Sequence, residues 1–499
     1  MKFRHGRRFA GWFVVCVCLL ISDPGTAQEW SSRASHAADD LFKQHPLALE
    51  SPPVNTRVRS EVVPFVPIAE RHSAALETSL VAAESPHFPS VRVTGFFHLD
   101  TGLFQQDAIN RSTLGDIQDG VGFRRARLQA VGNLSEFMTY SLEMDFATAG
   151  RPSFMDVWGE QQQLPVLGNL RIGHYRQPTS MDSLTSIRQL EFLERSLPFQ
   201  ALDPFRRVGI MAHDKSDNEM WSWAYGIYRT GGFNNAPLGD SRFATDIGDQ
   251  GGFSTAGRLT HLMYFDEKTE GRYLLHAGGH YDYSRLTAST ANPIPFYQAQ
   301  AIPEFFVGDP AGGGLTVNGT PPFANTGRLA ADAFNFFGLQ LAGQYGPSHF
   351  QAEYMATSVN QIGNPQVFYD GAYVQGGIFL TGENRTYNRL FGVFDRVAPS
   401  SDFFTSDGEA NFCGLGAWEV VARWSYVSLN DADAVPIGFA AGPPASPGPG
   451  RVHDATLGLN WYWNAYSKVQ INWIHAFLKN ASTGASDCDI YCARFHVEF

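Results

Sequence analysis

Apolar and polar residues alternate with a period of two along most of this chain. Near the C-terminus, for example, Ile471 and Trp473 alternate with Gln470 and Asn472. Successive side chains of a β-strand point to opposite faces, so this alternation predicts strands with one apolar and one polar face. Because the pattern begins at residue 91 and continues to the end of the chain, we expect an all-β protein.

The alternation divides into segments separated by loops rich in Gly, Asn, Asp and Pro. The sixteen predicted strands cover residues 91–104, 121–134, 138–148, 153–160, 168–176, 207–213, 220–229, 254–265, 272–284, 333–345, 348–359, 371–381, 416–429, 452–464, 467–479 and 490–499. An even number of antiparallel strands can close into a transmembrane β-barrel, and about 16 to 18 strands enclose an aqueous channel. We then expect the odd-numbered residues of 455–463, 469–477 and 491–499 to face lipid.

A soluble β-sandwich would show the same alternation, but three features favour a barrel in a membrane. Trp461 and Trp463 lie near the end of a strand, as in the aromatic girdles of membrane barrels. Charged residues such as Glu143 and Asp145 recur in mid-strand, which a watery lumen permits. The last residue, Phe499, ends an alternating strand and resembles the assembly signal of bacterial outer-membrane barrels. It therefore predicts an interaction with the outer-membrane assembly machinery.

Composition excludes several other classes of protein. The 499 residues are 43% hydrophobic and 17% charged, with a formal net charge of −12. No apolar run after the first 30 residues approaches the roughly 20 residues of a spanning helix, which excludes a helical membrane protein. The hydrophobic content excludes a fully disordered chain. The acidic balance, with no basic run after Arg8, argues against a nucleic-acid partner.

The N-terminal region has the features of a secretory signal peptide. Basic residues, Arg7 and Arg8 among them, precede an apolar stretch at 9–21, and small residues follow at 25–27. We therefore expect a signal peptide over 1–27, a Pro/Ala-rich and mostly disordered linker over 28–90, and a barrel domain over 91–499. The predicted location is the bacterial outer membrane.

Eight motifs follow one another within residues 91–499. They are GFRRARL at 122–128, LTS at 184–186, FLERSLP at 192–198, RRVGI at 206–210, YVQ at 373–375, LTGE at 380–383, GAWE at 416–419 and LGLNWY at 457–462. In these motifs and their order the chain resembles the phosphate-selective porin O and P family. The resemblance implies a barrel of 16 strands, usually a homotrimer, through which anions such as phosphate or polyphosphate diffuse.

The long connection at 177–206 is the predicted constriction loop, because in porins of this kind the loop at that position folds inward and narrows the pore. Its charged residues include Arg188, Glu191, Glu194, Arg195 and Arg206. One interpretation is that they contact the solute. The other is that Glu191 and Glu194 pair with Arg188 and Arg195 within one helical turn and hold the shape of the loop.

Strand parity places six arginines on the lumen side. They are Arg92, Arg125, Arg127, Arg171, Arg423 and Arg494. A row of guanidinium groups can replace the hydration shell of a phosphate and bind anions as they pass. Alternatively, each arginine pairs with a lumen carboxylate, such as Glu143, Asp145, Glu419 or Glu498, and the pore is wide and weakly selective. In the family, phosphate specificity is associated with lysines as well as arginines. Only five lysines follow residue 27 of this chain, so we expect weak anion preference at most.

The function predicted from the sequence is an outer-membrane porin, a passive diffusion channel for small hydrophilic or anionic solutes. The alternative is an occluded, receptor-like barrel whose long extracellular loops, 291–330 and 385–415, bind a ligand. No HExxH, GxSxG or P-loop motif is present, and we expect no enzyme, no cofactor and no metal site. Three cysteines follow the predicted signal peptide, and Cys413 and Cys488 either pair or stay reduced.

Overall fold

The structure is a computed structural model, and it describes residues 87–147, 152–230, 252–288, 293–306, 320–403, 414–438, 448–480 and 484–499. The predicted signal peptide, nearly all of the predicted linker and Cys413 lie outside these residues. These three predictions therefore stay predictions. Residues 85–499 form one compact unit.

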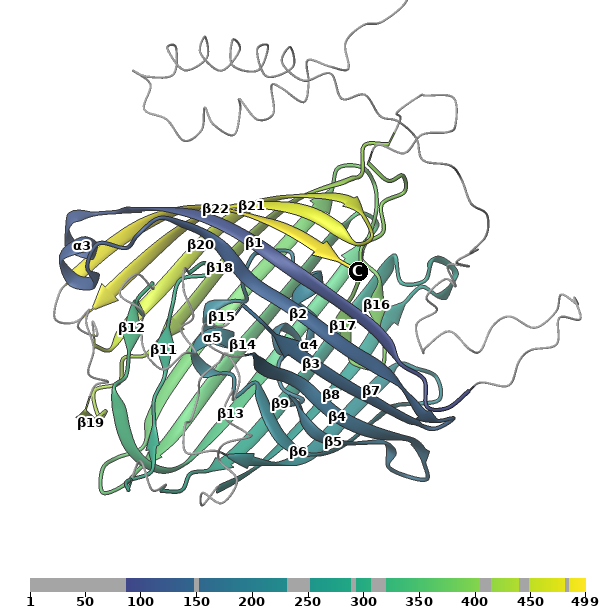
Figure 1. Ribbon diagram of the computed structural model, residues 1–499. Helices are drawn as coiled ribbons and strands as arrows, with labels where there is room; N and C mark the ends of the chain where they lie inside the picture. Colours follow the sequence, from purple (N-terminus) through teal and green to yellow (C-terminus); the bar gives the residue numbers. More distant parts are fainter. Residues whose placement is uncertain are drawn as a thin grey trace, which may run out of the picture. The chain divides into compact units, whose positions relative to one another are not determined.

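Sixteen long antiparallel strands form a closed barrel, as the alternation predicted (Figure 1). Their bounds are β1 (Arg92–Gln106), β2 (Gly120–Ser135), β3 (Met138–Asp145), β4 (Ser153–Leu164), β5 (Gly168–Arg176), β6 (Arg206–Lys215), β7 (Trp221–Thr230), β8 (Gly252–Phe265), β9 (Tyr273–Arg285), β13 (Arg328–Tyr345), β14 (Ser348–Gln361), β15 (Val367–Phe379), β18 (Ala417–Ser428), β20 (Gly450–Asn464), β21 (Ser467–Asn480) and β22 (Gly484–Glu498). Each pairs with its neighbour in sequence, and β22 pairs with β1 to close the seam.

Shorter elements lie in the connections between the strands. The helices are α3 (Ala108–Leu114), α4 (Met181–Leu184) and α5 (Leu197–Leu202), with single 3₁₀ turns η1 (Ile187–Gln189) and η2 (Glu267–Thr269). The short strands are β10 (Phe296–Tyr297), β11 (Gln300–Ala301), β12 (Ala324–Asn325), β16 (Tyr387–Asn388), β17 (Val393–Phe394) and β19 (Pro436–Gly438). Among the residues described, no helix is long and apolar enough to cross a membrane.

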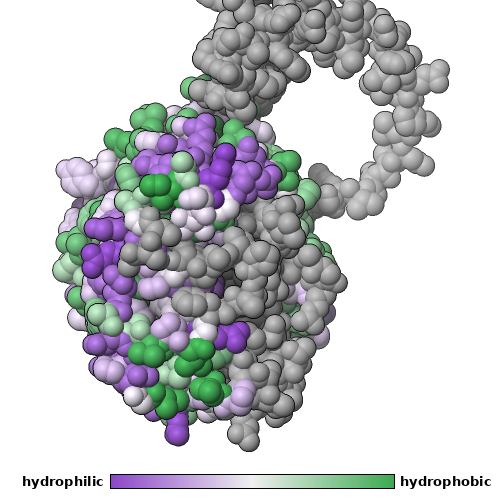
Figure 2. Space-filling view, turned by 90° about the vertical axis from the view of Figure 1, so that its left-hand side faces the viewer, coloured by the Kyte–Doolittle hydropathy of each residue, from purple (hydrophilic) through white to green (hydrophobic). Residues whose placement is uncertain are grey.

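The two faces of the barrel wall differ as the period-two pattern predicted. In β22 the side chains of Cys492, Arg494 and His496 are buried, whereas Tyr491 is exposed, as is Phe499 directly after the strand. The odd-numbered residues of β20 and β21 face outward in the same way, which confirms the predicted orientation. In the space-filling view, hydrophobic residues gather in patches among hydrophilic ones (Figure 2).

The connection between β5 and β6 packs against the inward-facing side chains of the wall. It carries α4, η1 and α5, and Figure 1 draws the two helices within the outline of the barrel. Phe199 and Leu202 of α5 belong to a buried apolar cluster that also contains Phe305, Phe323 and Phe334. The cluster joins the 177–205 segment to the β10–β12 region and to β13, so this part of the interior is filled by side chains.

The connection between β15 and β18 starts at the end of the barrel opposite to the β5–β6 connection, and the structure describes its residues 380–403 and 414–416. Twelve barrel strands precede it, so it lies at the end where β1 begins and where the two-residue turns at 346–347 and 465–466 lie. Short turns mark the periplasmic end of such barrels. The prediction that 291–330 and 385–415 are both extracellular loops is therefore wrong, because the two connections lie at opposite ends.

Candidate functional site

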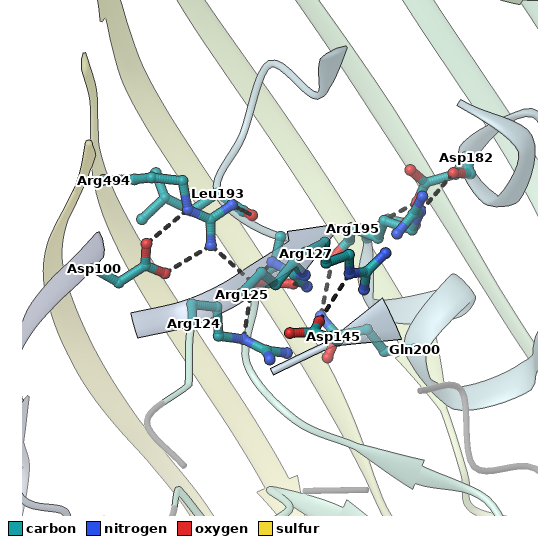
Figure 3. Close-up of polar contacts among 12 residues, drawn as sticks. Asp100, Arg124, Arg125, Arg127, Asp145, Asp182, Leu193, Arg195, Gln200 and Arg494 are labelled. Atoms are coloured by element: carbon teal, nitrogen blue, oxygen red, sulfur yellow. Dashed lines mark hydrogen bonds and ion pairs between the residues drawn. The ribbon is translucent and has the colours of Figure 1, made fainter. Parts of the chain in front are cut away.

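One carboxylate of the 177–205 segment gathers three arginines from the wall. Glu194 accepts two hydrogen bonds from Arg125, at 2.8 and 2.7 Å, and forms ion pairs with Arg124 at 3.2 Å and with Arg494 at 2.9 Å. Arg494 also donates to both carboxylate oxygens of Asp100, at 2.7 and 2.6 Å (Figure 3). The cluster joins β1, β2 and β22 to the segment inside the barrel.

Burial and charge act in opposite directions on Glu194. Burial alone would raise the pKa of this carboxyl, but Arg125, Arg124 and Arg494 outweigh it and hold the pKa well below its ordinary value. Glu194 is therefore ionised at neutral pH. It acts as an internal counter-ion for three guanidinium groups.

Arg124 reaches this cluster because the register of β2 changes beside it. His98 lies opposite Arg125, but Leu99 lies opposite Phe123, so Arg124 is an extra residue in a β-bulge. Parity assigns Arg125 and Arg127 to the lumen and Arg124 to the lipid side. The bulge instead lets the consecutive residues 124 and 125 both contact Glu194. Sequence reasoning missed Arg124, and the GFRRARL motif was the available signal.

Three of the other four predicted lumen arginines of the strands also lie beside carboxylates. Arg127 pairs with Asp145 at 2.8 Å and with Glu143 at 3.6 Å, and Arg171 pairs with Glu160 at 2.7 Å. Arg423 donates to Glu304 from the β10–β12 region, at 2.7 Å from its Nε atom, and to the Glu194 carbonyl at 3.0 Å. Arg92 is exposed at the start of β1.

The charged residues of the predicted constriction loop do not pair with one another. Glu191 pairs with Arg385 and with His349, at 3.5 Å for the histidine. Arg188 pairs with Glu143 at 3.7 Å and with Glu498 at 3.6 Å. The interpretation that these residues hold the loop by pairing within one helical turn is wrong. The turns of the segment, α4, η1 and α5, are too short and too far apart to bring these side chains together.

The remaining two loop residues are also fixed by local contacts. Arg195 donates to the carbonyl oxygens of Asp182 and Thr185, each at 2.7 Å. Arg206 is the first residue of β6 and pairs with Asp156 at 2.8 Å. Asp156 also lies 3.9 Å from Arg176, a further lumen-side arginine that the sequence analysis did not select.

In several pairs on the β2–β5 wall the arginine is the more exposed partner. The side chain of Arg124 is 14% exposed against 5% for Glu194, and that of Arg188 is 15% exposed against 7% for Glu143. Arg171 is 14% exposed against 6% for Glu160. In these three pairs the arginine side chain is thus the more exposed to water. We refer to Arg124, Arg171 and Arg188 as the arginine strip.

The periplasmic-end segment, residues 380–403, contacts the 177–205 segment inside the barrel. Arg385 pairs with Glu191 and donates to the Gln189 carbonyl at 2.8 Å. Arg396 pairs with Glu498 on the last strand. Segments that enter from opposite ends therefore meet in the interior. No cluster of three or more His, Cys, Asp or Glu side chains among the described residues could hold a metal ion.

A closed antiparallel barrel with an apolar outer face and an ion-paired interior is the architecture of an outer-membrane porin. The family model for phosphate-selective porin O and P matches residues 91–499, and the chain belongs to this family. Its function is that of an outer-membrane diffusion channel. Family and fold together indicate a channel rather than an enzyme.

Individual relatives are distant. An uncharacterised protein of Caulobacter vibrioides is 24% identical over 368 residues, which cover 72% of this chain and 67% of that protein. OmpT of Vibrio cholerae, in its trimer form, aligns with a TM-score of 0.46 and 11% identity over 82% of this chain and 99% of OmpT. The anion-selective porin from Comamonas acidovorans gives the same four values.

Proposed function

We propose that this porin conducts small hydrophilic solutes with a weak preference for anions, and that the 177–205 segment narrows the pore. The observation that carries the proposal is the unequal exposure of the ion pairs beside β2–β5. The side chains of Arg124, Arg171 and Arg188 are more exposed than those of their carboxylate partners, which favours contact between a permeating ion and the arginines. Cations fixed along a confined aqueous path raise the local concentration of anions.

The same pairs limit the strength of this preference. Each arginine of the strip already has a carboxylate within 4 Å, so a phosphate must compete with a covalently attached anion for the guanidinium N–H groups. Phosphate and polyphosphate then pass as members of a broad class of solutes. We expect conductance to rise with phosphate concentration with little saturation.

We also propose that the protein forms a homotrimer and that a signal peptide directs it to the outer membrane. Family resemblance supports a homotrimer, and the basic and apolar stretch at 1–27 supports export through a signal peptide. The terminal Phe499 supports recognition by the assembly machinery. Its N–H donates to the Gly95 carbonyl at 2.9 Å, and the Gly95 N–H donates back at 2.9 Å, so the residue extends the seam with β1.

The test is the reversal potential of single channels in planar bilayers with a KCl gradient. The triple variant Arg124→Gln, Arg171→Gln, Arg188→Gln should shift the reversal potential toward that of a cation-preferring pore. Arg451→Gln is the matched control, because Arg451 is exposed on the outward face of β20 and should leave the potential unchanged. If the triple variant does not move the potential, the arginine strip does not set selectivity.

A further inference from the structure

Arg258 is a buried arginine whose hydrogen bonds go to neutral oxygens, as do those of Arg195. It lies on the inward face of β8, and its Nη2 atom donates to the Gly392 carbonyl at 2.9 Å and to Gln340 Oε1 at 3.2 Å. Nη1 donates to the Phe391 carbonyl at 2.5 Å. Within the described part of the chain no carboxylate lies within 4.0 Å of it, whereas Arg125, Arg127, Arg423 and Arg494 each have one.

Hydrogen-bonding nitrogens at and around Arg258 lack partners. Arg258 Nε, Gln340 Nε2 and both ring nitrogens of His280 are buried and have no partner among the residues described. The three residues are neighbours across the sheet. Arg258 lies opposite His280, and His280 lies opposite Gly338, two residues before Gln340. A buried, unsatisfied group of this kind costs about 1–3 kcal/mol, so four of them together call for an occupant.

Two glycines leave room for these side chains. An added Cβ at Gly338 would lie 2.5 Å from His280 Cε1 and 2.9 Å from its Nε2. An added Cβ at Gly278, which lies opposite Gln340, would overlap Gln340 Nε2. Any residue with a side chain at 278 or 338 would displace the groups that carry the free nitrogens.

We propose that a small inorganic anion binds here, held by Arg258 Nε, Gln340 Nε2 and an N–H of His280. A guanidinium buried without a counter-charge is strongly disfavoured, and water supplies hydrogen bonds but no compensating charge. Glu353 lies across the sheet from Gln340, but it forms no ion pair with Arg258 within 4.0 Å. Its oxygens accept hydrogen bonds from the backbone N–H groups of Met181 and Asp182, each at 2.8 Å.

An aromatic ring and a hairpin flank these groups. The Phe336 ring lies 4.8 Å from the His280 ring between centroids, and the carbonyls of Phe391 and Gly392, in the turn of the β16–β17 hairpin, accept hydrogen bonds from Arg258. Tyr387 of the hairpin is hydrogen-bonded through its hydroxyl to His276 Nδ1 at 2.6 Å. The anion would balance the charge of the arginine that holds the Phe391 and Gly392 carbonyls. It would therefore help to fix this hairpin to the wall.

The direct test is diffraction from crystals of the full-length protein grown in bromide. We expect an anomalous peak within hydrogen-bond distance of Arg258 Nε and Gln340 Nε2. An ordered water there, without anomalous signal, would overturn the proposal.

A stability measurement tests the same site in detergent. Gluconate is replaced by chloride at constant ionic strength, and the midpoint temperature of unfolding is read from the loss of the heat-modifiable gel band. This midpoint should rise with chloride concentration and then level off. Arg258→Gln should abolish this rise. Arg396→Gln is the matched control, because Arg396 ties the same segment to the wall but already pairs with Glu498. Should Arg258→Gln fail to fold, His280→Phe replaces it. A rise that persists in the site variant would refute the proposal.

Discussion

Replacement of Glu194 by Gln removes the charge on which three arginines converge, while it nearly preserves the size and shape of the side chain. In the wild type, Arg124, Arg125 and Arg494 face the two carboxylates of Glu194 and Asp100, an excess of one positive charge. The variant has an excess of two. A unit charge at ~7 Å from a permeating ion in water-like surroundings changes the energy of that ion by ~0.6 kcal/mol, with opposite signs for anions and cations.

The expected result is a several-fold rise in the ratio of anion to cation permeability. Reversal potentials of Glu194→Gln and wild-type channels in the same KCl gradient measure it. Breaking a buried ion pair from one side also costs about 3–5 kcal/mol, so the variant should lose its heat-modifiable form at a lower temperature. Glu219→Gln at the periplasmic end is the control. A Glu194→Gln barrel that forms normally and keeps the wild-type potential would show that permeating ions do not approach this cluster.

Two further predictions concern assembly and pH. Phe499→Ala should lower the amount of heat-modifiable barrel in outer membranes if, as we propose, the ring is part of the terminal strand signal; unchanged levels in membrane fractions would argue against that role. Asp203 accepts hydrogen bonds from Thr179, Ser180 and Phe205 and forms no ion pair with the residues described, and burial raises its pKa to about 6. The folded state therefore favours the protonated form of Asp203. As a result, about 3 kcal/mol of the free energy of unfolding that is present below pH 4 is lost as the pH rises through 6. Asp203→Asn should remove this step from heat-modification midpoints measured between pH 4 and 8, and a persisting step would exclude Asp203.

The strands could be predicted because the alternation of apolar and polar residues is visible within each strand by itself. All sixteen predicted strands have a counterpart in the barrel, since alternation is a local property and the loops between them break it. The sequence could also have shown at which end of the barrel the connection between β15 and β18 begins. Twelve predicted strands precede that segment, and an even number returns the chain to the end where the first strand began.

The partners of the lumen charges could not be predicted. Parity fixes the face of a side chain, but Arg125 and Glu194 are 69 residues apart, and their contact depends on how the 177–205 segment crosses the interior. Arg124 was missed for a related reason, because one bulge opposite His98 and Leu99 reverses parity locally. Neither feature leaves a periodic trace in the sequence.

The position of Glu194 has a consequence for how the barrel forms. The seam between β1 and β22 joins residues about 400 positions apart, and so it carries the largest loop-closure entropy of any strand pair in the wall. Glu194 binds Arg125 on one side of that seam and Arg494 on the other, which makes the 177–205 segment an internal brace across the joint. Pairing of β1 with β22 and ordering of the 177–205 segment would then occur together. A chain whose 177–205 segment is misplaced during assembly would lack these contacts, and its barrel would remain open between β1 and β22.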